Sequence, residues 1–301
     1  MKRFQFSKNA LMIALLSLTA LISGCTTTES VKKDDSKLQI VATFYPMAEF
    51  SRQVAGDLAQ VVTLIPTGVE PHDWEPGPNH MVQIQEADLF VYNGIGMEGF
   101  VEQTLDSLTS KGLLAVEASK GVTLIEGSHD DHAHEDAHAG ETAEEHAAHA
   151  DEENKEVGVG GKPLDPHVWL SPLTAQQQVR NIQNALSERD PANAAQYEKN
   201  ANAYIEKLKA LDEKFKQATS NAKHKEFVTQ HAAFGYMAEQ YGLEQVGISG
   251  LSPEQEPSAG KVAEVTAFVK EHGINYILFE ALVSPKVAET VAKEAGVKTA
   301  V

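Results

Sequence analysis

Cysteine is almost absent from this sequence, since Cys25 is the only one among 301 residues. A lone cysteine cannot form an internal disulfide, so the mature protein has to be stable without one. Its position near the N-terminus, directly after the small residues Ser23 and Gly24, points to processing rather than to cross-linking.

Basic residues are also scarce. The chain has 25 Lys and Arg against 43 Asp and Glu, which gives a formal net charge of −18 at pH 7. The phosphates of a nucleic acid would repel such a surface, so nucleic acid is excluded as a partner. Much of this charge is local, because residues 129–153 hold ten Asp or Glu and no Lys or Arg. Without that stretch the formal charge is −8, which is ordinary for a soluble protein.

The N-terminal apolar run, residues 10–22, is shorter than the about 20 residues that a membrane-spanning helix needs. Three basic residues precede it, and residues 22–25 read ISGC. This order predicts a bacterial lipoprotein signal, residues 1–25, in which Cys25 becomes the lipidated N-terminus. An ordinary secretory peptide that contains a cysteine is the alternative. Residues 26–37 are polar and predict a flexible tether, so we expect a protein held by lipid on the extracytoplasmic face of the cell membrane.

Strand and helix patterns alternate in the first lobe that we predict, residues 38–172. Short apolar strands are expected at residues 38–43, 60–65, 88–93 and 122–125, with helices at residues 46–54, 79–87 and 98–108. This alternation predicts an α/β fold, a mostly parallel sheet with helices on both faces.

An acidic, histidine-rich insertion at residues 126–161 interrupts this pattern. Six of the twelve histidines of the protein lie in it, namely His129, His132, His134, His138, His146 and His149. Almost nothing in the insertion can contribute to a core, so we predict that it is disordered. Its histidines predict several weak, auxiliary metal sites, and a merely solvated segment is the alternative.

A linking helical region is expected at residues 173–218. One helix runs over residues 174–187, and Asp190 followed by Pro191 restarts it as an N-cap residue and a first-turn proline. The second helix carries an apolar stripe at spacings of three and four residues. About 28 residues at 1.5 Å each make a rod of roughly 40 Å, long enough to join two lobes. A helix confined to the second lobe is the alternative.

The second α/β lobe is predicted at residues 219–301. Strands are expected at residues 226–229, 275–279 and 298–301, helices at residues 231–241, 258–271 and 285–295, and a loop at residues 247–257. The last strand is four residues long and nothing follows it, so we expect that the natural chain continues past Val301.

Three histidines outside the insertion have rigid settings. His72 and His167 each follow a proline, and each has a tryptophan, Trp74 or Trp169, two residues on. The proline restrains the backbone, and the indole can wall a pocket against water. His231 follows a predicted parallel strand, and ligands bind outside such strand ends in open α/β sheets. Three neutral imidazoles suit Zn²⁺, whereas Mg²⁺ and Ca²⁺ call for oxygen ligands.

Several motifs, taken with the lipoprotein start, resemble those of the zinc/manganese solute-binding lipoproteins of bacterial ABC transporters. They are FYP at residues 44–46, PHDWEP at 71–76, YNG at 92–94, DPHVWL at 165–170 and TQHAAFGY at 229–236. The resemblance covers essentially the whole mature chain. It implies two α/β lobes joined by one long rigid helix, with a metal ion buried between them.

The resemblance also implies a ligand set. His72, His167 and His231 match the family's three ligand positions. A histidine at the third position goes with zinc and a glutamate with manganese, so zinc is expected and Mn²⁺ is the lesser alternative. The family's fourth ligand is a carboxylate in a loop that this sequence does not reach. Glu280 and Glu70 are candidate substitutes, and a solvated role for each is the alternative.

Two other functions compete with metal capture. Three histidines plus an open position are also the pattern of a catalytic zinc site, but the sequence shows neither a His-Glu-x-x-His helix nor a nucleophile motif. A surface adhesin, a host-binding lipoprotein with a structural metal, is the second alternative. The favoured prediction is a monomeric, non-enzymatic lipoprotein that captures Zn²⁺ and delivers it to an ABC permease.

Overall fold

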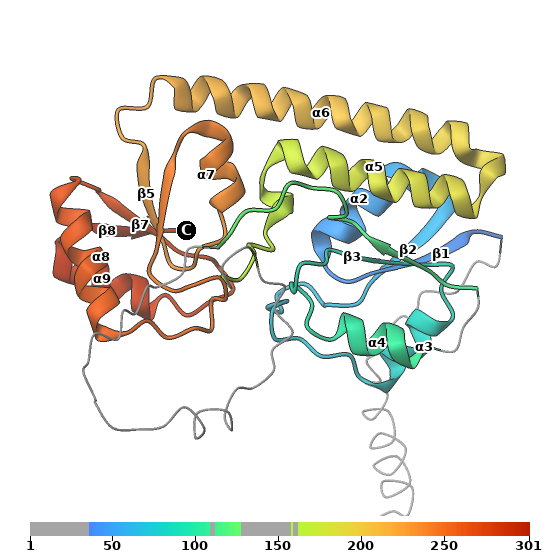
Figure 1. Cartoon of the computed structure of the whole chain (residues 1–301), viewed down its shortest axis with the longest axis horizontal. Coiled ribbons are helices and arrows are strands. Elements are labelled where there is room, and N and C mark those ends of the chain that lie inside the picture. The colour runs from blue at the N-terminus through green and yellow to red at the C-terminus, as the bar shows by residue number, and fades with distance from the viewer. Residues whose placement is uncertain (1–35, 109–111, 128–157, 159–161) are drawn as a thin grey trace, which may run out of the picture. The chain divides into compact units, whose positions relative to one another are not determined.

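The structure, a computed structural model, describes residues 36–108, 112–127, 158 and 162–301. Two four-stranded parallel sheets, each flanked by helices, form its frame (Figure 1). The prediction of an α/β fold with two parallel sheets is therefore confirmed.

The first sheet has the strand order β2-β1-β3-β4, and every pairing in it is parallel. Its strands are β1 (Leu38–Ala42), β2 (Ala59–Thr63), β3 (Leu89–Tyr92) and β4 (Leu114–Glu117). Side chains alternate along β1, so Ile40 and Val41 enter different cores. Ile40 packs with α2 (Tyr45–Ala55) and the later long helices, and Val41 packs with α3 (Pro78–Gln85) and α4 (Val101–Ser107).

Two strand predictions need correction. Residues 122–125 are not a strand, because Gly121 turns the chain at φ +77° and sends them away from the sheet. They meet the loop at residue 165 instead, where the Asp165 amide donates to the Ile125 oxygen at 3.0 Å. The edge strands β4 and β6 (Glu244–Gly247) were not predicted. Each is short and has one buried residue. The sequence of β6, EQVG, lacks the apolar pattern of a strand, whereas β4, LAVE, has a short apolar run that the prediction missed.

Two helices begin later than predicted, because the residues before them turn inward. Residue 98 was expected in a helix, but α4 begins at Val101, and the Glu98 carboxylate accepts hydrogen bonds from Thr43 Oγ1 at 2.6 Å and Asn93 N at 2.8 Å. Burial raises the pKa of Glu98, and these bonds offset part of that effect. Residue 231 was likewise expected in a helix, whereas α7 (Gly235–Tyr241) begins four residues later. Both inward turns lie beside the candidate site.

The linking region folds as α5 (Pro172–Arg189), a 3₁₀ turn (Pro191–Asn193) and the 27-residue α6 (Ala194–Ser220). The predicted restart at residue 190 is confirmed, and the Asp190 carboxylate accepts hydrogen bonds from the Asn193 amide at 2.7 Å and the Tyr197 hydroxyl at 2.8 Å. Among the described residues, no helix is both long and apolar enough to cross a membrane.

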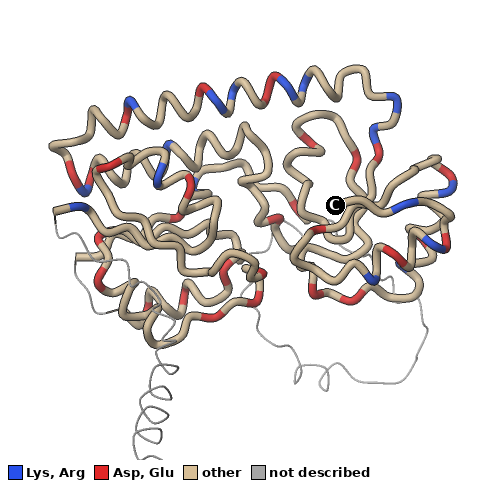
Figure 2. The backbone as a smooth tube through the Cα atoms, turned by 180° about the vertical axis from the view of Figure 1, so that it is seen from behind, with Lys and Arg blue, Asp and Glu red and all other residues tan. Residues whose placement is uncertain are grey.

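Helix α6 spans both lobes, as Figure 1 shows. Its beginning packs on α2 and α5 in the first lobe. Near its end Phe215 stacks on Tyr241 of α7 with ring centroids 5.2 Å apart, and the Tyr241 hydroxyl donates to Asp212 at 3.0 Å. Acidic and basic residues alternate along it (Figure 2), as in the ion pair between Lys216 and Asp212. The alternative of a helix confined to the second lobe is wrong.

The second sheet repeats the relative order of the first, β6-β5-β7-β8. Its further strands are β5 (Glu226–Thr229), β7 (Tyr276–Leu278) and β8 (Lys298–Ala300). Val228 and Ile277 point into a core closed by α8 (Ala259–Glu271) and α9 (Lys286–Ala295). Ser258 caps α8 by accepting from the Lys261 amide at 3.1 Å.

Because the two sheets share one strand order, each has an equivalent position at the carboxyl ends of its first and third strands. The chain adds the second strand on one side of the first strand and the third strand on its other side. Connections therefore leave β1 and β3, or β5 and β7, in opposite directions, and a crevice opens at their carboxyl ends. The sequence motifs at residues 92–94 and 229–236 lie at these crevices.

Candidate metal centre

The structure brings His72, His167 and His231 together. One ring nitrogen from each lies within 4.8 Å of the other two, and no second group of this kind occurs in the described ranges. His72 Nε2 and His167 Nε2 are 3.2 Å apart. Two ligand nitrogens on a tetrahedral zinc ion, each about 2.0–2.1 Å from it, are about 3.3 Å apart. Two imidazole lone pairs face each other at this distance only with a proton or a cation between them.

His167 is held by the carboxylate two residues before it. Asp165 Oδ1 lies 2.8 Å from His167 Nδ1 and accepts the His167 amide at 2.9 Å. Both side chains are 2% exposed. The carboxylate keeps the proton on Nδ1 and leaves the Nε2 lone pair for a metal ion. Burial lowers the pKa of His167, an effect that Asp165 opposes.

The loop carrying His167 is fastened to the crevice of the first sheet. Asn93, directly after β3, donates to the Pro166 oxygen at 2.9 Å and accepts from Gln178 of α5 at 2.8 Å. The Trp169 ring lies 5.4 Å from the His167 ring and 4.9 Å from that of Phe44. Trp169 therefore lies against the His167 ring, and its role as a wall against water stays a prediction.

His231 lies just past β5, at the crevice of the second sheet. Its backbone oxygen accepts from Thr229 Oγ1 at 2.6 Å and from Gln245 Nε2 at 3.2 Å. Gln245 also accepts the Phe234 amide at 2.9 Å. A side chain from the neighbouring strand thus fixes the turn that aims His231, which is 7% exposed.

Glu280 follows β7 and meets His231 across the crevice. Its Oε1 is 2.7 Å from His231 Nδ1, but the angle is not that of a hydrogen bond, and His231 Nδ1 and Glu280 Oε2 have no hydrogen-bond partner among the described residues. Glu280 is outside the group of mutually close ligand atoms, so the geometry favours it as the carboxylate behind His231. Its predicted role as a ligand stays a prediction.

His72 occupies the proline-rich loop and is the one partly exposed member of the three. Glu70 Oε1 accepts its amide at 3.2 Å. Burial raises the pKa of Glu70, and the bond from His72 counters part of that rise. Trp74 packs on Phe100 at 5.3 Å and on His80 at 5.0 Å, which braces the loop.

Several supporting residues escaped the sequence analysis. Asp165 and Asn93 stand inside motifs that drew attention for other residues, and a carboxylate two positions before a proline-held histidine is a usable signal. Gln245 and Glu98 gave no such signal, since Gln245 acts on His231 from the neighbouring strand and Glu98 bonds Thr43 of a distant segment as well as nearby Gly94. Cys25 and the six histidines of the insertion lie outside the described residues.

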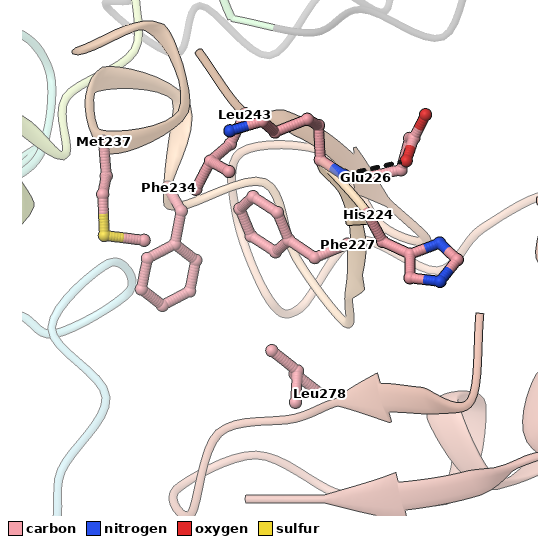
Figure 3. Close-up of a pocket in the computed structure, with 8 residues that line it drawn as sticks. His224, Glu226, Phe227, Phe234, Met237, Leu243 and Leu278 are labelled. Atoms are coloured by element: carbon pink, nitrogen blue, oxygen red, sulfur yellow. Dashed lines mark hydrogen bonds between the residues drawn. The ribbon is translucent and has the colours of Figure 1, made fainter. Parts of the chain in front are cut away.

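A separate apolar pocket of about 290 Å³ lies on the second sheet. Figure 3 shows Phe227, Phe234 and Leu278 around it, with Met237 of α7 beside them. None of the three clustered histidines lines it. The pocket is therefore distinct from the candidate metal centre.

Two parallel sheets, a helix that contacts both lobes and imidazoles converging from three loops define a two-lobed solute-binding protein for a metal ion. Residues 40–301 match the family model of the zinc-uptake complex component A, periplasmic. The chain belongs to this family.

Two named relatives and a solved structure agree with this family membership. The high-affinity zinc uptake system protein ZnuA of Bacillus subtilis is 44% identical over 299 residues, covering 98% of this chain and 88% of that protein. The zinc-binding lipoprotein AdcA of Streptococcus pneumoniae is 45% identical over 288 residues, covering 95% of this chain but only 53% of AdcA. This chain thus spans about half of AdcA. The Zn(II)-bound ZnuA-like domain of that AdcA has a TM-score of 0.67 at 44% identity, covering 87% of this chain and 86% of the domain.

Proposed function

We propose that this protein captures Zn²⁺ outside the cytoplasm and delivers it to the permease of an ABC transporter. The observation that carries the proposal is the convergence of three imidazole nitrogens with ligand-like spacing where two lobes meet. Nitrogen donors favour zinc over hard ions, and over Mn²⁺, which prefers oxygen. In this proposal His72, His167 and His231 bind the ion, and Asp165 and Glu280 hold two of the rings from behind.

A non-enzymatic role fits this arrangement. The three rings come from loops between the lobes, and two of them are buried, which suits enclosing an ion rather than admitting a substrate. Zinc-dependent hydrolysis is one alternative, and within the described part of the chain it has no specific observation in its favour. Adhesion to a host protein is the other, and it is supported by the likeness to the laminin-binding protein of Streptococcus agalactiae, which has a TM-score of 0.71 at 34% identity.

A zinc titration of the tag-free full chain tests the proposal, with a form lacking residues 128–153 beside it. We expect one tight site in both proteins. The sequence of the insertion predicts disorder, so ordering its six histidines around an ion is expected to cost conformational entropy. We therefore expect weak sites only in the full chain. A full chain without a tight site for Zn²⁺ would contradict the function. Loss of the tight site in the shortened form would contradict the auxiliary role of the insertion.

The proposed lipid anchor depends on Cys25. The supporting observation is the ISGC sequence at residues 22–25. Replacing Cys25 with alanine is expected to abolish labelling by a radioactive fatty acid in cells and to release the protein from the membrane fraction, because the acceptor thiol is gone. The Cys25→Ser variant, which also lacks the thiol, serves as a second test. Fatty-acid labelling that persists in either variant would overturn the anchor.

A further inference from the structure

Tyr236 joins the lobe that carries His231 to the loop that carries His167. It lies on α7 and is 5% exposed. Its hydroxyl donates to the backbone oxygen of Asp165 at 2.9 Å and lies 3.4 Å from the amide of Ile125. Helix α7 follows β5 of the second sheet, whereas residue 165 precedes α5. The bond to Asp165 therefore crosses from one lobe to the other.

Gly235, the residue before it, makes room for the Asp165 carboxylate. A Cβ atom at this position would lie 2.5 Å from Asp165 Oδ2 and 3.1 Å from Ile125 Cδ1. Gly235 does not have a positive φ, so the backbone conformation does not require glycine here. The close approach of the carboxylate does. Two consecutive residues thus enclose Asp165, one against its carboxylate and one on its backbone.

Asp165 is also the residue that orients His167, through the contacts of 2.8 and 2.9 Å already described. The Tyr236 ring packs with buried Val168, the residue after His167, and with Ile95. Movement of Tyr236 would therefore reach the His167 ring through one hydrogen-bonded residue. Burial raises the pKa of Tyr236, so the hydroxyl stays protonated and able to donate.

We propose that Gly235 and Tyr236 form a cross-lobe latch that positions His167 for the metal ion through Asp165. The lobe that supplies His231 would then also set the ligand supplied by the other lobe, and the two ligands would be assembled together. The inference rests on the proposed function, because it treats His167 as a ligand. Tyr236 acts through Asp165 and is a positioning residue.

The test compares Tyr236→Phe with Tyr241→Phe. Both tyrosines lie on α7, and each donates its hydroxyl to an aspartate, but Tyr241 bonds Asp212 of α6. Loss of a residue that orients a metal-bound histidine typically lowers metal affinity 10–100-fold. Asp165 is that direct partner and Tyr236 acts through it, so for Tyr236→Phe we expect a loss at the lower end of this range, about tenfold, with changed visible absorption of the Co²⁺-loaded protein. Tyr241→Phe should match the wild type in both measurements. Gly235→Ala should resemble Tyr236→Phe.

A second readout needs no metal. In the metal-free wild type, ¹⁵N-histidine NMR should show a protected Nδ1 proton on His167, and Tyr236→Phe should lose that protection while Tyr241→Phe keeps it. Wild-type affinity and Co²⁺ spectrum in Tyr236→Phe would overturn the latch, as would equal losses in both tyrosine variants. If the wild type itself failed to bind zinc tightly, the proposed function would fall, and the NMR comparison would still decide whether Tyr236 orients His167.

Discussion

The His167→Ala variant is expected to bind zinc at least about a hundredfold more weakly than the wild type. Zinc held by about four ligands gains about 10–16 kcal/mol, so one ligand accounts for about 3 kcal/mol, or roughly a hundredfold in affinity. His167 is buried, and its Asp165 partner would be left without the ring that it holds. Competition with a chelating zinc indicator measures the change.

The control is His272→Ala. His272 stacks on Phe268 and lies near Glu226 in the second lobe, outside the histidine cluster. Its removal should leave the tight site unchanged. Zinc binding at wild-type strength in His167→Ala would refute the proposed site.

Acid is expected to release the metal and to weaken the metal-free fold. Zinc binding requires neutral imidazoles, so each ring that must lose a proton lowers the apparent affinity about tenfold per pH unit below its pKa. For the stability of the metal-free fold, the direction of the pH dependence follows from the pKa of His167. Burial lowers its pKa in the folded protein, whereas the unfolded chain has the ordinary value of about 6.5. Below pH about 6.5 the unfolded state therefore binds a proton that the folded state does not.

Neutral His167 makes its full contribution to the free energy of unfolding above pH about 6.5. This contribution is lost as the pH falls from about 6.5 toward the pKa that His167 has in the folded protein. The slope is up to about 1.4 kcal/mol per pH unit in that window. Thermal unfolding of metal-free wild type and His167→Ala between pH 7.5 and 5 measures it. The variant should show a shallower decline, because it lacks this group. Parallel curves would show that His167 does not contribute.

The sequence predicted those parts of the site that are local. The signals for the three histidines lie next to them in the sequence: a proline before His72 and His167, and a strand before His231. The structure brings these three rings together. The parallel sheets and the helix restart at Asp190 follow from patterns of the same short range. A periodicity over ten or so residues is enough for such features.

The supporting residues that the sequence analysis did not predict depend on tertiary packing. Glu98 reads as the first turn of a helix, but its carboxylate is needed under the loop at Asn93. Gln245 reads as part of a polar segment, yet it fixes the turn at His231 from the next strand. Gly235 falls inside the helix expected at residues 231–241, and only the position of Asp165 explains it. No apolar periodicity along the chain carries this information. Glu98 bonds Asn93 and Gly94 nearby but also Thr43, which is 55 residues away, and the partners of Gln245 and Gly235 lie 14 and 70 residues away.

The unequal burial of the three histidines has a consequence for the order in which the proposed site would bind and release an ion. His167 and His231 are buried, whereas His72 is partly exposed on a loop stiffened by prolines. In the proposed site an arriving ion would meet His72 first, and a leaving ion would lose its bond to His72 before it passes into water. The buried pair would then govern how tightly the cargo is held, and the His72 loop would govern how fast it exchanges. A receiving protein that displaced only the His72 loop could release the ion without separating the two lobes.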